Sequence, residues 1–390
     1  MYQLYKTKPV NYFLCSFLML LLPVLSWSQT AYPVYTSGEE GHKIYRIPAI
    51  VQLPNKTLLA FAEGRVKGGN DFGDINIVLK RSEDDGKTWS ALQTVVDYGN
   101  LQAGNVAPVI DLLDPRYPKG RLFLFYNTGN QSEWDIRKGK GQREVWYITS
   151  IDGGYTWSEA INITQQVKPT PNNWRTYANT PGHAFQIPDG KYKGRLIIPG
   201  NHSEGEGKPD FSDYFSHVFY SDDHGDHFKI SEHLPQPGSN EATATYVSQD
   251  RIVLNARNQK GDIKTRIMGL SKDGGAHWDT VYFDHQLPDP VCEGAILTIG
   301  KHKGKAVVVF CNAANTKQRN HLSLRLSNDD GKIWSKSWLV DSTDNTKVDY
   351  TAYSDIVRLR KNIVGVLYEK DNYASIVFKP IKISKKNNHP

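Results

Sequence analysis

Short apolar runs recur along this chain and are separated by Gly, Pro and polar residues. Residues 75–80 read INIVLK, and residues 293–310 read EGAILTIGKHKGKAVVVF, which is typical of two strands joined by a Gly/Lys turn. Long stretches with the 3.6-residue apolar period of a helix are absent from the sequence. The pattern predicts many short strands joined by turns, and therefore an all-β fold.

The N-terminal segment departs from this pattern. Lys6 and Lys8 precede the apolar run FLCSFLMLLLPVLSWS at residues 13–28, which ends in small residues. A basic start, an apolar run of this length and a small-residue end are typical of a secretory signal peptide. The run is too short and too interrupted for a membrane span. We therefore predict a signal peptide at 1–28 and a single domain at 29–390, exported to the periplasm, cell surface or medium without stable membrane insertion.

Five eight-residue stretches share the pattern S-x-D-x-G-x-x-W, with Phe in place of Trp in one of them. They are SEDDGKTW at 82–89, SIDGGYTW at 150–157, SDDHGDHF at 221–228, SKDGGAHW at 271–278 and SNDDGKIW at 327–334. The Asp can accept hydrogen bonds from the backbone of its own turn, the Gly supplies a positive φ, and the aromatic residue packs onto an apolar layer. Each stretch is predicted to be a hairpin turn, with no catalytic or calcium-binding role for its Asp.

These turns begin 50 to 71 residues apart. A repeat of about 61 residues divides the chain after its signal segment into about six units. Four-stranded sheets repeated around a ring are the β-propeller solution to exposed sheet edges. We therefore predict a six-bladed β-propeller in which one blade lacks the turn motif.

Composition narrows the range of ligands. The formal net charge is +6, but the lysines are scattered rather than clustered, so we predict no nucleic-acid partner. No H-x-x-x-H or comparable spacing supports a metal site, so no metal is predicted, and His183 and His202 are interpreted as loop histidines. Cys292 and Cys311 flank the two strands of 293–310 and form either a disulfide or two buried free thiols, since an export context permits a disulfide.

Three arginines stand at the ends or starts of predicted strands in widely separated parts of the chain. Arg46 lies in YRIP, Arg257 follows the run IVLNA, and Arg319 precedes a strand-like run. The inner strands of a propeller converge on its central axis, so these side chains can share one pocket. Three guanidinium groups would repel one another unless an anion lay between them, and the planar fork of arginine fits a carboxylate. The sequence therefore predicts a site for a carboxylate ligand.

The ordered set of YRIP, the five turn motifs, LNAR, QR before a strand and YTAYSDI resembles the exo-α-sialidase (neuraminidase) family, and the resemblance covers nearly the whole chain after residue 28. It implies a six-bladed propeller that removes terminal sialic acids from glycoconjugates with retention of configuration, through a sialyl-tyrosine intermediate. It also implies that no metal or organic cofactor is needed, and that sialylated glycoproteins, glycolipids and oligosaccharides are the substrates.

The resemblance implies that Tyr353 of AYSDI is the nucleophile and that Glu241 of SNEATATY is its base. Sialic acid carries a carboxylate on its anomeric carbon, which would repel a carboxylate nucleophile, and sialidases use tyrosine instead. A phenol has a pKa of about 10 and attacks poorly unless a base helps it. Glu241 lies 16 residues before Arg257, a separation that fits adjacent strands of one blade.

The general acid is expected in the segment FAEGRVKGGNDFGD at 61–74, where Asp71 and Asp74 compete. Asp71 follows the GGN tip and lies six residues after Arg65, where the family pattern places its acid, so Asp71 is preferred. Asp74 stands closer to the next strand and is interpreted as capping its start. Arg65 resembles the family's additional arginine near the acid, and Glu63 either neutralises it or contacts substrate.

Glu369 resembles the acidic residue that pairs with the first arginine of the family's triad. It lies 16 residues after Tyr353, on what should be the neighbouring strand. A carboxylate beside Arg46 would orient the guanidinium and partly neutralise it.

Other activities of the same scaffold stay open. A trans-sialidase, an intramolecular trans-sialidase or a hydrolase of a related 2-keto acid sugar would use the same machinery. A non-catalytic lectin or assembly propeller would be expected to lose Tyr353, Glu241 or an arginine, and this chain retains them. We expect the protein to be a monomer.

Overall fold

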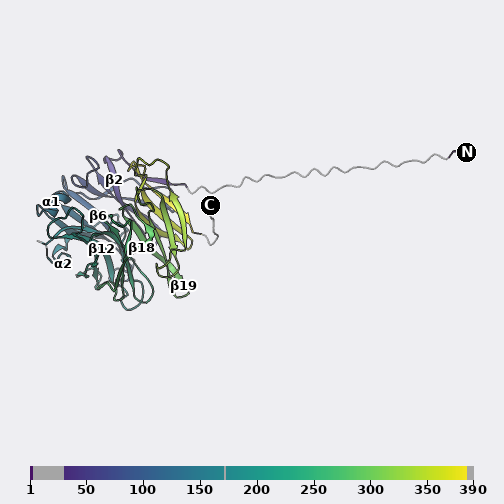
Figure 1. Ribbon diagram of the computed structural model, residues 1–390. Helices are drawn as coiled ribbons and strands as arrows, with labels where there is room; N and C mark the ends of the chain where they lie inside the picture. The colour runs from purple at the N-terminus through teal and green to yellow at the C-terminus, as the bar shows by residue number, and fades with distance from the viewer. Residues whose placement is uncertain (3–29, 171–172, 384–390) are drawn as a thin grey trace.

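The short apolar runs form strands throughout the computed structural model (Figure 1). The structure describes residues 1–2, 30–170 and 173–383. In this part of the chain it contains 25 strands and two short helices, α1 (Glu133–Arg137) and α2 (Thr164–Val167). The prediction of an all-β fold is confirmed.

Hydrogen bonds join the described strands into five sheets, four of which are separate and have four or five strands each. One contains β10 (Trp174–Asn179), β12 (Leu196–Glu204), β13 (Tyr214–Ser221) and β14 (Lys229–Ile230), with β11 (Phe185–Gln186) beside β12. The next contains β15 (Ser239–Tyr246), β16 (Ile252–Asn258), β17 (Thr265–Ser271) and β18 (Thr280–Pro288). The third contains β19 (Gly294–His302), β20 (Lys305–Ala313), β21 (Leu322–Ser327) and β22 (Lys336–Asp341). The fourth contains β23 (Thr351–Arg360), β24 (Ile363–Lys370), β25 (Ser375–Lys382) and β1 (Tyr32–Thr36).

The fifth sheet has eight strands. Its first half contains β2 (Ile44–Gln52), β3 (Leu58–Arg65), β4 (Ile75–Ser82) and β5 (Gln93–Val96). Its second half contains β6 (Gln102–Asp111), β7 (Arg121–Gly129), β8 (Arg143–Ser150) and β9 (Ile161–Asn162). A single parallel pair, Ile75 with Gln102, joins the halves, whereas the neighbouring strands within each half are antiparallel. Six separate sheets were predicted, but hydrogen bonding defines five among the described strands, because this one pair links β4 to β6.

The sheets follow one another around a ring. Contacts join β2 to β6, β6 to β10, β12 to β15, β15 to β19, β19 to β23, and β23 back to β2. Figure 1 shows the same order as the colour passes from purple at β2 through teal at β12 to green at β19 and yellow at the last strands. The prediction of a β-propeller is confirmed at the level of its class.

The first described strand closes the ring. β1 pairs antiparallel with β25, so the two ends of the chain complete one sheet. Tyr35 in β1 is fully buried, and its hydroxyl donates to the carbonyl of Ala60 in β3 at 2.7 Å. This strand therefore ties the last sheet to the first.

The five turn motifs have one geometry, and each lies between the third and fourth strands of its unit. In every turn the Ser hydroxyl donates to Oδ1 of the Asp at 2.6–2.8 Å. The same hydroxyl accepts from the Gly backbone N–H at 2.7–3.0 Å. The five glycines have φ between 81° and 93°. Oδ1 of each Asp also accepts a backbone N–H of its own turn. The predicted conformation of the Gly and the predicted hydrogen bonding of the Asp are therefore confirmed.

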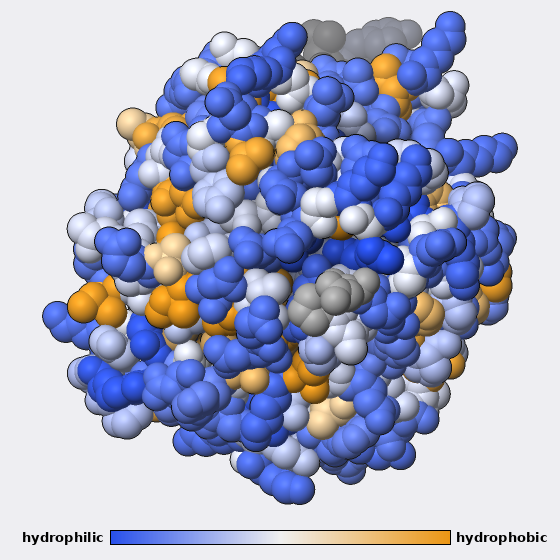
Figure 2. Space-filling model, turned by 90° about the vertical axis from the view of Figure 1, so that its left-hand side faces the viewer, coloured by the Kyte–Doolittle hydropathy of each residue, from blue (hydrophilic) through white to orange (hydrophobic). Residues whose placement is uncertain are grey.

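The core lies between neighbouring sheets. Phe125 of β7 contacts Phe219 of β13 edge to face, with ring centroids 5.5 Å apart, and both side chains are fully buried. On the face shown in Figure 2, hydrophilic residues dominate and hydrophobic ones are scattered among them. Apolar side chains thus pack between neighbouring sheets, and polar side chains can therefore face the centre of the ring.

Cys292 and Cys311 are buried free thiols, the second of the two alternatives left open by the sequence. Cys311 lies in β20 opposite Ala295 of β19, whereas Cys292 precedes β19. Burial raises the pKa of each thiol to about 12. Both side chains are therefore uncharged packing groups.

The interpretation of His202 as a loop histidine is wrong. His202 lies within β12, opposite Tyr177 of β10 and Phe215 of β13, and it is fully buried. His183 does lie in a loop, but it is buried there and its Nδ1 lies 2.6 Å from a carboxylate oxygen of Asp355.

The predicted signal peptide lies outside the described residues, apart from residues 1 and 2. In the part of the chain that is described, no helix has the length and apolar character needed to cross a bilayer.

Candidate active site

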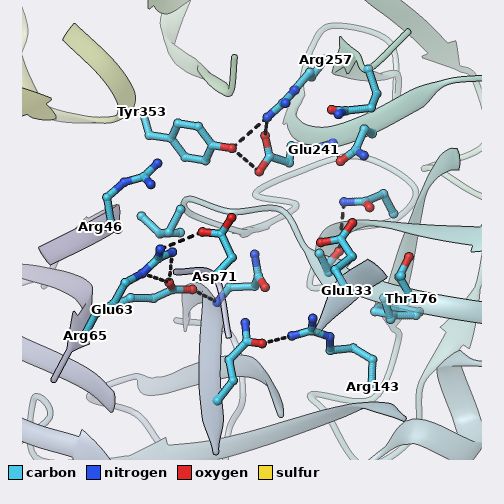
Figure 3. A pocket seen from close by; sticks show the side chains of 18 of the residues that line it. Arg46, Glu63, Arg65, Asp71, Glu133, Arg143, Thr176, Glu241, Arg257 and Tyr353 are labelled. Carbon is cyan, nitrogen blue, oxygen red and sulfur yellow. Dashed lines mark hydrogen bonds and ion pairs between the residues drawn. The ribbon is translucent and has the colours of Figure 1, made fainter. Parts of the chain in front are cut away.

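A cavity of about 250 Å³ is lined by residues from all five sheets or from the loops that join their strands (Figure 3). Eight of the nine predicted site residues line it: Arg46, Glu63, Arg65, Asp71, Glu241, Arg257, Arg319 and Tyr353. The ninth, Glu369, is buried beside Arg46. The predicted convergence of the three arginines on one pocket is confirmed.

The YRIP sequence sets the position of Arg46. Pro48 has no N–H to donate to the neighbouring strand, and the β2–β3 register shifts between Arg46 and Ala49. Ile47 takes a φ of 58° within this irregularity. Its backbone N–H donates to Oε1 of Glu369 at 2.9 Å, and the Arg46 Nε donates to the same oxygen at 2.6 Å. A backbone group and a side chain thus share one carboxylate.

Glu369 also holds the strand that carries Tyr353. Its second oxygen accepts the backbone N–H of Tyr353 at 3.1 Å. Burial alone would lower the pKa of Arg46, but the charge of Glu369 outweighs that effect and raises the pKa. Arg46 is therefore a fixed cation at the wall of the cavity.

Tyr353, Glu241 and Arg257 form a closed triangle of hydrogen bonds (Figure 3). The Tyr353 hydroxyl donates to Oε1 of Glu241 at 2.5 Å. One Arg257 nitrogen donates to Oε2 of Glu241 at 2.7 Å and to the Tyr353 oxygen at 2.9 Å. Burial and then the charge of Glu241 raise the pKa of Tyr353 well above its ordinary value. The phenol is therefore neutral here, with a carboxylate in place to take its proton.

Arg319 is the least neutralised of the three arginines. It donates to the Tyr373 hydroxyl at 3.2 Å and to the Val291 carbonyl at 3.4 Å. Among the described residues it forms no ion pair with a carboxylate, unlike Arg46 and Arg257. A cation in this position favours an anionic ligand in the cavity.

Arg65 links two carboxylates at the opposite wall. It donates to Oε2 of buried Glu63 at 2.7 Å and to Oδ1 of Asp71 at 2.7 Å. Glu63 Oε1 accepts the backbone N–H of Asn105 at 3.0 Å. Of the two roles considered for Glu63, the geometry shows the pairing with Arg65.

Asp71 is the accessible carboxylate of the β3–β4 loop. Its side chain is 78% exposed although it lines the cavity. Desolvation would raise the pKa of Asp71, but Arg65, with smaller effects of Arg46 and Arg319, outweighs it and lowers the pKa. Asp74 does not line this cavity, and its carboxylate lies 3.7 Å from Lys67. The loop therefore presents Asp71, not Asp74, to a ligand.

Sequence reasoning missed the far wall of the cavity. This wall includes Gln102, Glu133, Arg143, Thr176 and Tyr177. Arg143 is buried, donates to Oε1 of Gln102, and leaves its Nε without a hydrogen-bond partner among the described residues. Arg143 is the first residue of the strand REVWYITS, just as Arg319 stands before its own strand. This position at a strand start is the sequence signal that could have identified Arg143 as a cavity residue.

Comparison with known proteins places these residues in context. A family model described as a BNR repeat-like domain matches residues 56–365. A sialidase of Micromonospora viridifaciens is 31% identical over 86% of this chain and 52% of its own length. A sialidase of Bacteroides fragilis is 27% identical over 89% of this chain and 63% of its own length. An exo-alpha-sialidase of Aspergillus fumigatus is 26% identical over 93% of this chain and 89% of its own length.

The chain thus spans between about half and two thirds of the length of the two bacterial relatives. Among solved structures, a Hadza microbial sialidase aligns with a TM-score of 0.76 at 24% identity, over 91% of this chain and 68% of that one. A leech intramolecular trans-sialidase aligns with a TM-score of 0.72 at 17% identity, over 91% of this chain and 71% of that one. At these identities the structures support the propeller fold.

Proposed function

Because the chain belongs to the exo-α-sialidase family, within the proteins that carry a BNR repeat-like domain, we propose that it is a retaining exo-α-sialidase. It would hydrolyse terminal sialic acids from glycoproteins, glycolipids and oligosaccharides. The observation that carries the proposal is the triangle of Tyr353, Glu241 and Arg257 beside two further arginines in one cavity. A carboxylate-bearing sugar fits such a site because its anion neutralises the arginines while its anomeric carbon faces the phenol.

In this proposal Arg46, Arg257 and Arg319 bind the substrate carboxylate. Arg46 and Arg257 are oriented by Glu369 and Glu241, so they are held before the ligand arrives. Arg319 has no carboxylate partner in the described chain and gains one from the substrate. Charge-assisted hydrogen bonds to arginine forks supply both affinity and orientation.

The first chemical step forms a bond between the Tyr353 oxygen and the anomeric carbon. The phenol proton passes to Glu241 along the existing 2.5 Å hydrogen bond. The bond to the leaving-group oxygen breaks, and Asp71 gives that oxygen its proton. Arg257, which contacts both Tyr353 and Glu241, stabilises the negative charge that develops on the phenol oxygen.

The second step releases the sugar with retained configuration. A water molecule attacks the anomeric carbon, Asp71 takes the proton of that water, and Glu241 returns its proton to Tyr353 as the covalent bond breaks. Glu63 and Arg65 have positioning roles in this scheme, because Arg65 anchors the Asp71 carboxylate and Glu63 holds Arg65.

One assay tests the reaction and its alternatives. The purified protein is incubated with a fluorogenic α-sialoside, and the released sugar is identified by mass and by the anomeric NMR signal. Free sialic acid released first as the α-anomer supports retaining hydrolysis. A 2,7-anhydro product would indicate an intramolecular trans-sialidase, and a product sialylated on an added acceptor would indicate transfer. Absence of any release, with binding retained, would indicate a non-catalytic propeller.

We also propose that the propeller has six blades. The eight-stranded sheet consists of two antiparallel four-stranded units held by a single parallel pair, and the other four sheets are separate. Two units and four sheets give six. An experimental structure in which β4 and β6 form a continuous ladder would contradict this count.

Export and oligomeric state are proposals from the sequence pattern. Residues 1–28 would be removed, and residues 29–390 would act outside the cytoplasm as a monomer, with no nucleic-acid or membrane partner. N-terminal sequencing of the protein recovered from the periplasm or medium, together with its mass in solution by light scattering, tests both. A retained N-terminus or a dimeric mass would contradict the respective proposal.

A further inference from the structure

Two histidines and a glutamate that take no part in the proposed mechanism meet at the end of β12. His202 and Glu204 are two positions apart in this strand and so share one face of the sheet. His233 reaches them from the loop after β14. His202 Nε2 lies 3.0 Å from Oε1 of Glu204, and His233 Nδ1 lies 3.5 Å from the same oxygen.

We propose that His202, Glu204 and His233 form a binding site for one divalent transition-metal ion, with zinc as the best fit. Zinc bonds to nitrogen and oxygen ligands at about 2.0–2.1 Å in a tetrahedral arrangement, which separates the ligand atoms by about 3.3 Å. The two measured separations, 3.0 and 3.5 Å, bracket that distance. All three ligand atoms lie within 4.8 Å of one another.

Access to the site suits a metal with one open position. The His202 side chain is fully buried, whereas those of Glu204 and His233 are 29% and 33% exposed. An ion can therefore enter from solvent and keep a water molecule as its fourth ligand. Imidazole and carboxylate are ligand types that zinc accepts, in the same combination of two histidines and one glutamate that catalytic zinc sites use.

Buried groups behind the site hold His202 in place. The Trp174 ring stacks on the His202 ring with planes 8° apart. His202 Nδ1 lies 3.0 Å from His217 Nδ1, and His217 Nε2 lies 2.8 Å from the hydroxyl of Tyr177, which lines the catalytic cavity. Metal-binding histidines are oriented in this way by a partner on their second nitrogen.

This chain of contacts fixes the ring protons when no metal is bound. The Glu204 carboxylate can only accept, so His202 Nε2 carries a hydrogen. A neutral His202 ring with its hydrogen on Nε2 has a lone pair on Nδ1, which therefore accepts from His217 Nδ1. His217 Nε2 then accepts from the Tyr177 hydroxyl.

Zinc would reverse that chain without changing the number of protons. A metal on His202 Nε2 moves the ring hydrogen to Nδ1, which then donates to His217 Nδ1. His217 in turn donates from Nε2 to the Tyr177 oxygen. The Tyr177 hydroxyl hydrogen then turns away from His217. The metal site is thus connected by hydrogen bonds to the wall of the substrate pocket.

A second cluster, Asp111, Asp114 and His224, shows what distinguishes this site. Asp114 already binds the guanidinium groups of Arg116 and Arg121. An added cation there would compete with two fixed cations. Glu204, by contrast, forms ion pairs with the two histidines alone among the described residues.

The binding test uses full-length protein without an affinity tag and zinc chloride alone, measured by isothermal titration calorimetry. We expect one ion per chain in the wild type. His233→Ala and Glu204→Gln should each weaken binding at least about tenfold, because even the loss of an outer-shell partner typically costs about that much metal affinity. His277→Ala is the matched control, because His277 is an exposed histidine beside a carboxylate in the fourth turn motif. Circular dichroism verifies that each variant is folded.

Two results would overturn the metal site: no binding by the wild type, or equal affinity in the wild type and both variants. The connection to Tyr177 has its own readout in the histidine ¹⁵N–¹H NMR spectrum. His217 should change from the Nδ1–H form to the Nε2–H form when zinc is added, and should not change in His233→Ala. Zinc binding without this change would refute the connection.

Discussion

At the scale of single residues, the proposed reaction depends on the neutral phenol of Tyr353 and on the two charged side chains that contact it, Glu241 and Arg257. Tyr353 lies in β23, whereas Glu241 and Arg257 lie in β15 and β16 of another sheet. Their hydrogen bonds give the phenol proton a destination and leave the arginine to stabilise the oxygen. The proposed mechanism depends on these three contacts more than on any other feature.

Replacing Tyr353 by Phe should abolish covalent catalysis but keep the arginine pocket. We expect kcat to fall by roughly 10³-fold or more, while the affinity for a sialic-acid analogue changes by less than about threefold. Steady-state kinetics and calorimetry measure the two quantities. Tyr350→Phe, a nearby tyrosine that does not line the cavity, serves as the control. Turnover close to that of the wild type in Tyr353→Phe would exclude the nucleophile.

Arg46→Lys keeps the positive charge but removes the planar fork that Glu369 orients. We expect kcat/KM to fall at least about tenfold, since hydrogen bonds to charged groups contribute roughly 1.5–3 kcal/mol each. A sialoside whose carboxylate is converted to an amide should bind poorly to the wild type and lose little more in the variant. Equal binding of acid and amide by the wild type would show that the arginines do not bind the carboxylate.

The proposed role of Asp71 as the acid predicts how activity depends on pH. Asp71 must be protonated to act as an acid, so activity on poor leaving groups falls as pH rises through its pKa. Arg65, Arg46 and Arg319 lower that pKa in the free protein. A bound substrate carboxylate offsets this positive charge and raises the pKa. The alkaline limb of kcat should therefore lie at higher pH than that of kcat/KM, and identical limbs would contradict the assignment.

The Asp71→Asn variant tests the role of the same carboxyl group at a fixed pH. The variant should lose far more activity on a sialoside with a poor leaving group than on an activated aryl sialoside, because only the former needs a proton. Parallel measurements of kcat/KM on both substrates give the ratio. Equal losses would indicate that Asp71 has a structural role.

At the scale of elements, the turn motifs show how a short polar pattern stabilises a blade. In the second motif, Asp152 accepts hydrogen bonds from the backbone of Tyr155 and Thr156 and from the Ser150 hydroxyl. Desolvation is the largest single effect and raises the pKa of Asp152, but these hydrogen bonds, together with one from the Thr156 hydroxyl, outweigh it and lower the pKa to about 2. A carboxyl whose pKa falls on folding stabilises the fold above its unfolded pKa, near 4, and loses that contribution as pH falls toward 2.

Asp152→Ala should therefore destabilise the protein by about 1–2 kcal/mol at neutral pH, comparable to loss of a helix cap. Thermal unfolding midpoints of the variant and the wild type measure the difference, which should shrink between pH 4 and pH 2. Glu159→Ala, an exposed carboxylate next to the same turn, is the control. Activity at low temperature should be unchanged, and a large loss of kcat would contradict a purely structural turn.

At the scale of the whole molecule, stability depends on closing the ring. Tyr35 of β1 packs fully buried and bonds to Ala60, so it joins the last sheet to the first. Tyr35→Ala should cost roughly 3–5 kcal/mol, as aromatic truncations in cores do. Tyr35→Phe removes only the hydrogen bond and should cost about 1 kcal/mol. Denaturant unfolding distinguishes the two, and equal effects would mean that the hydroxyl, not the packing, carries the contribution.

The sequence alone was enough to predict the repeated turns, the propeller class and the three arginines that meet in the cavity. These features depend on local patterns, such as the Ser, Asp and Gly of each turn, or on motifs kept in order along the chain. The pairing of Glu63 with Arg65 could be proposed because both lie in one strand.

Contacts between distant segments became known only from the folded structure. It selected free thiols for Cys292 and Cys311, brought Arg143 to the far wall of the cavity, and placed His202 beside Glu204 and His233. It also joined β4 to β6 through one pair of residues. No local sequence pattern encodes these contacts, because they form only when whole sheets pack side by side and the ring closes. A sequence repeat reports how far apart two residues are along the chain, and it does not report whether they are neighbours in space.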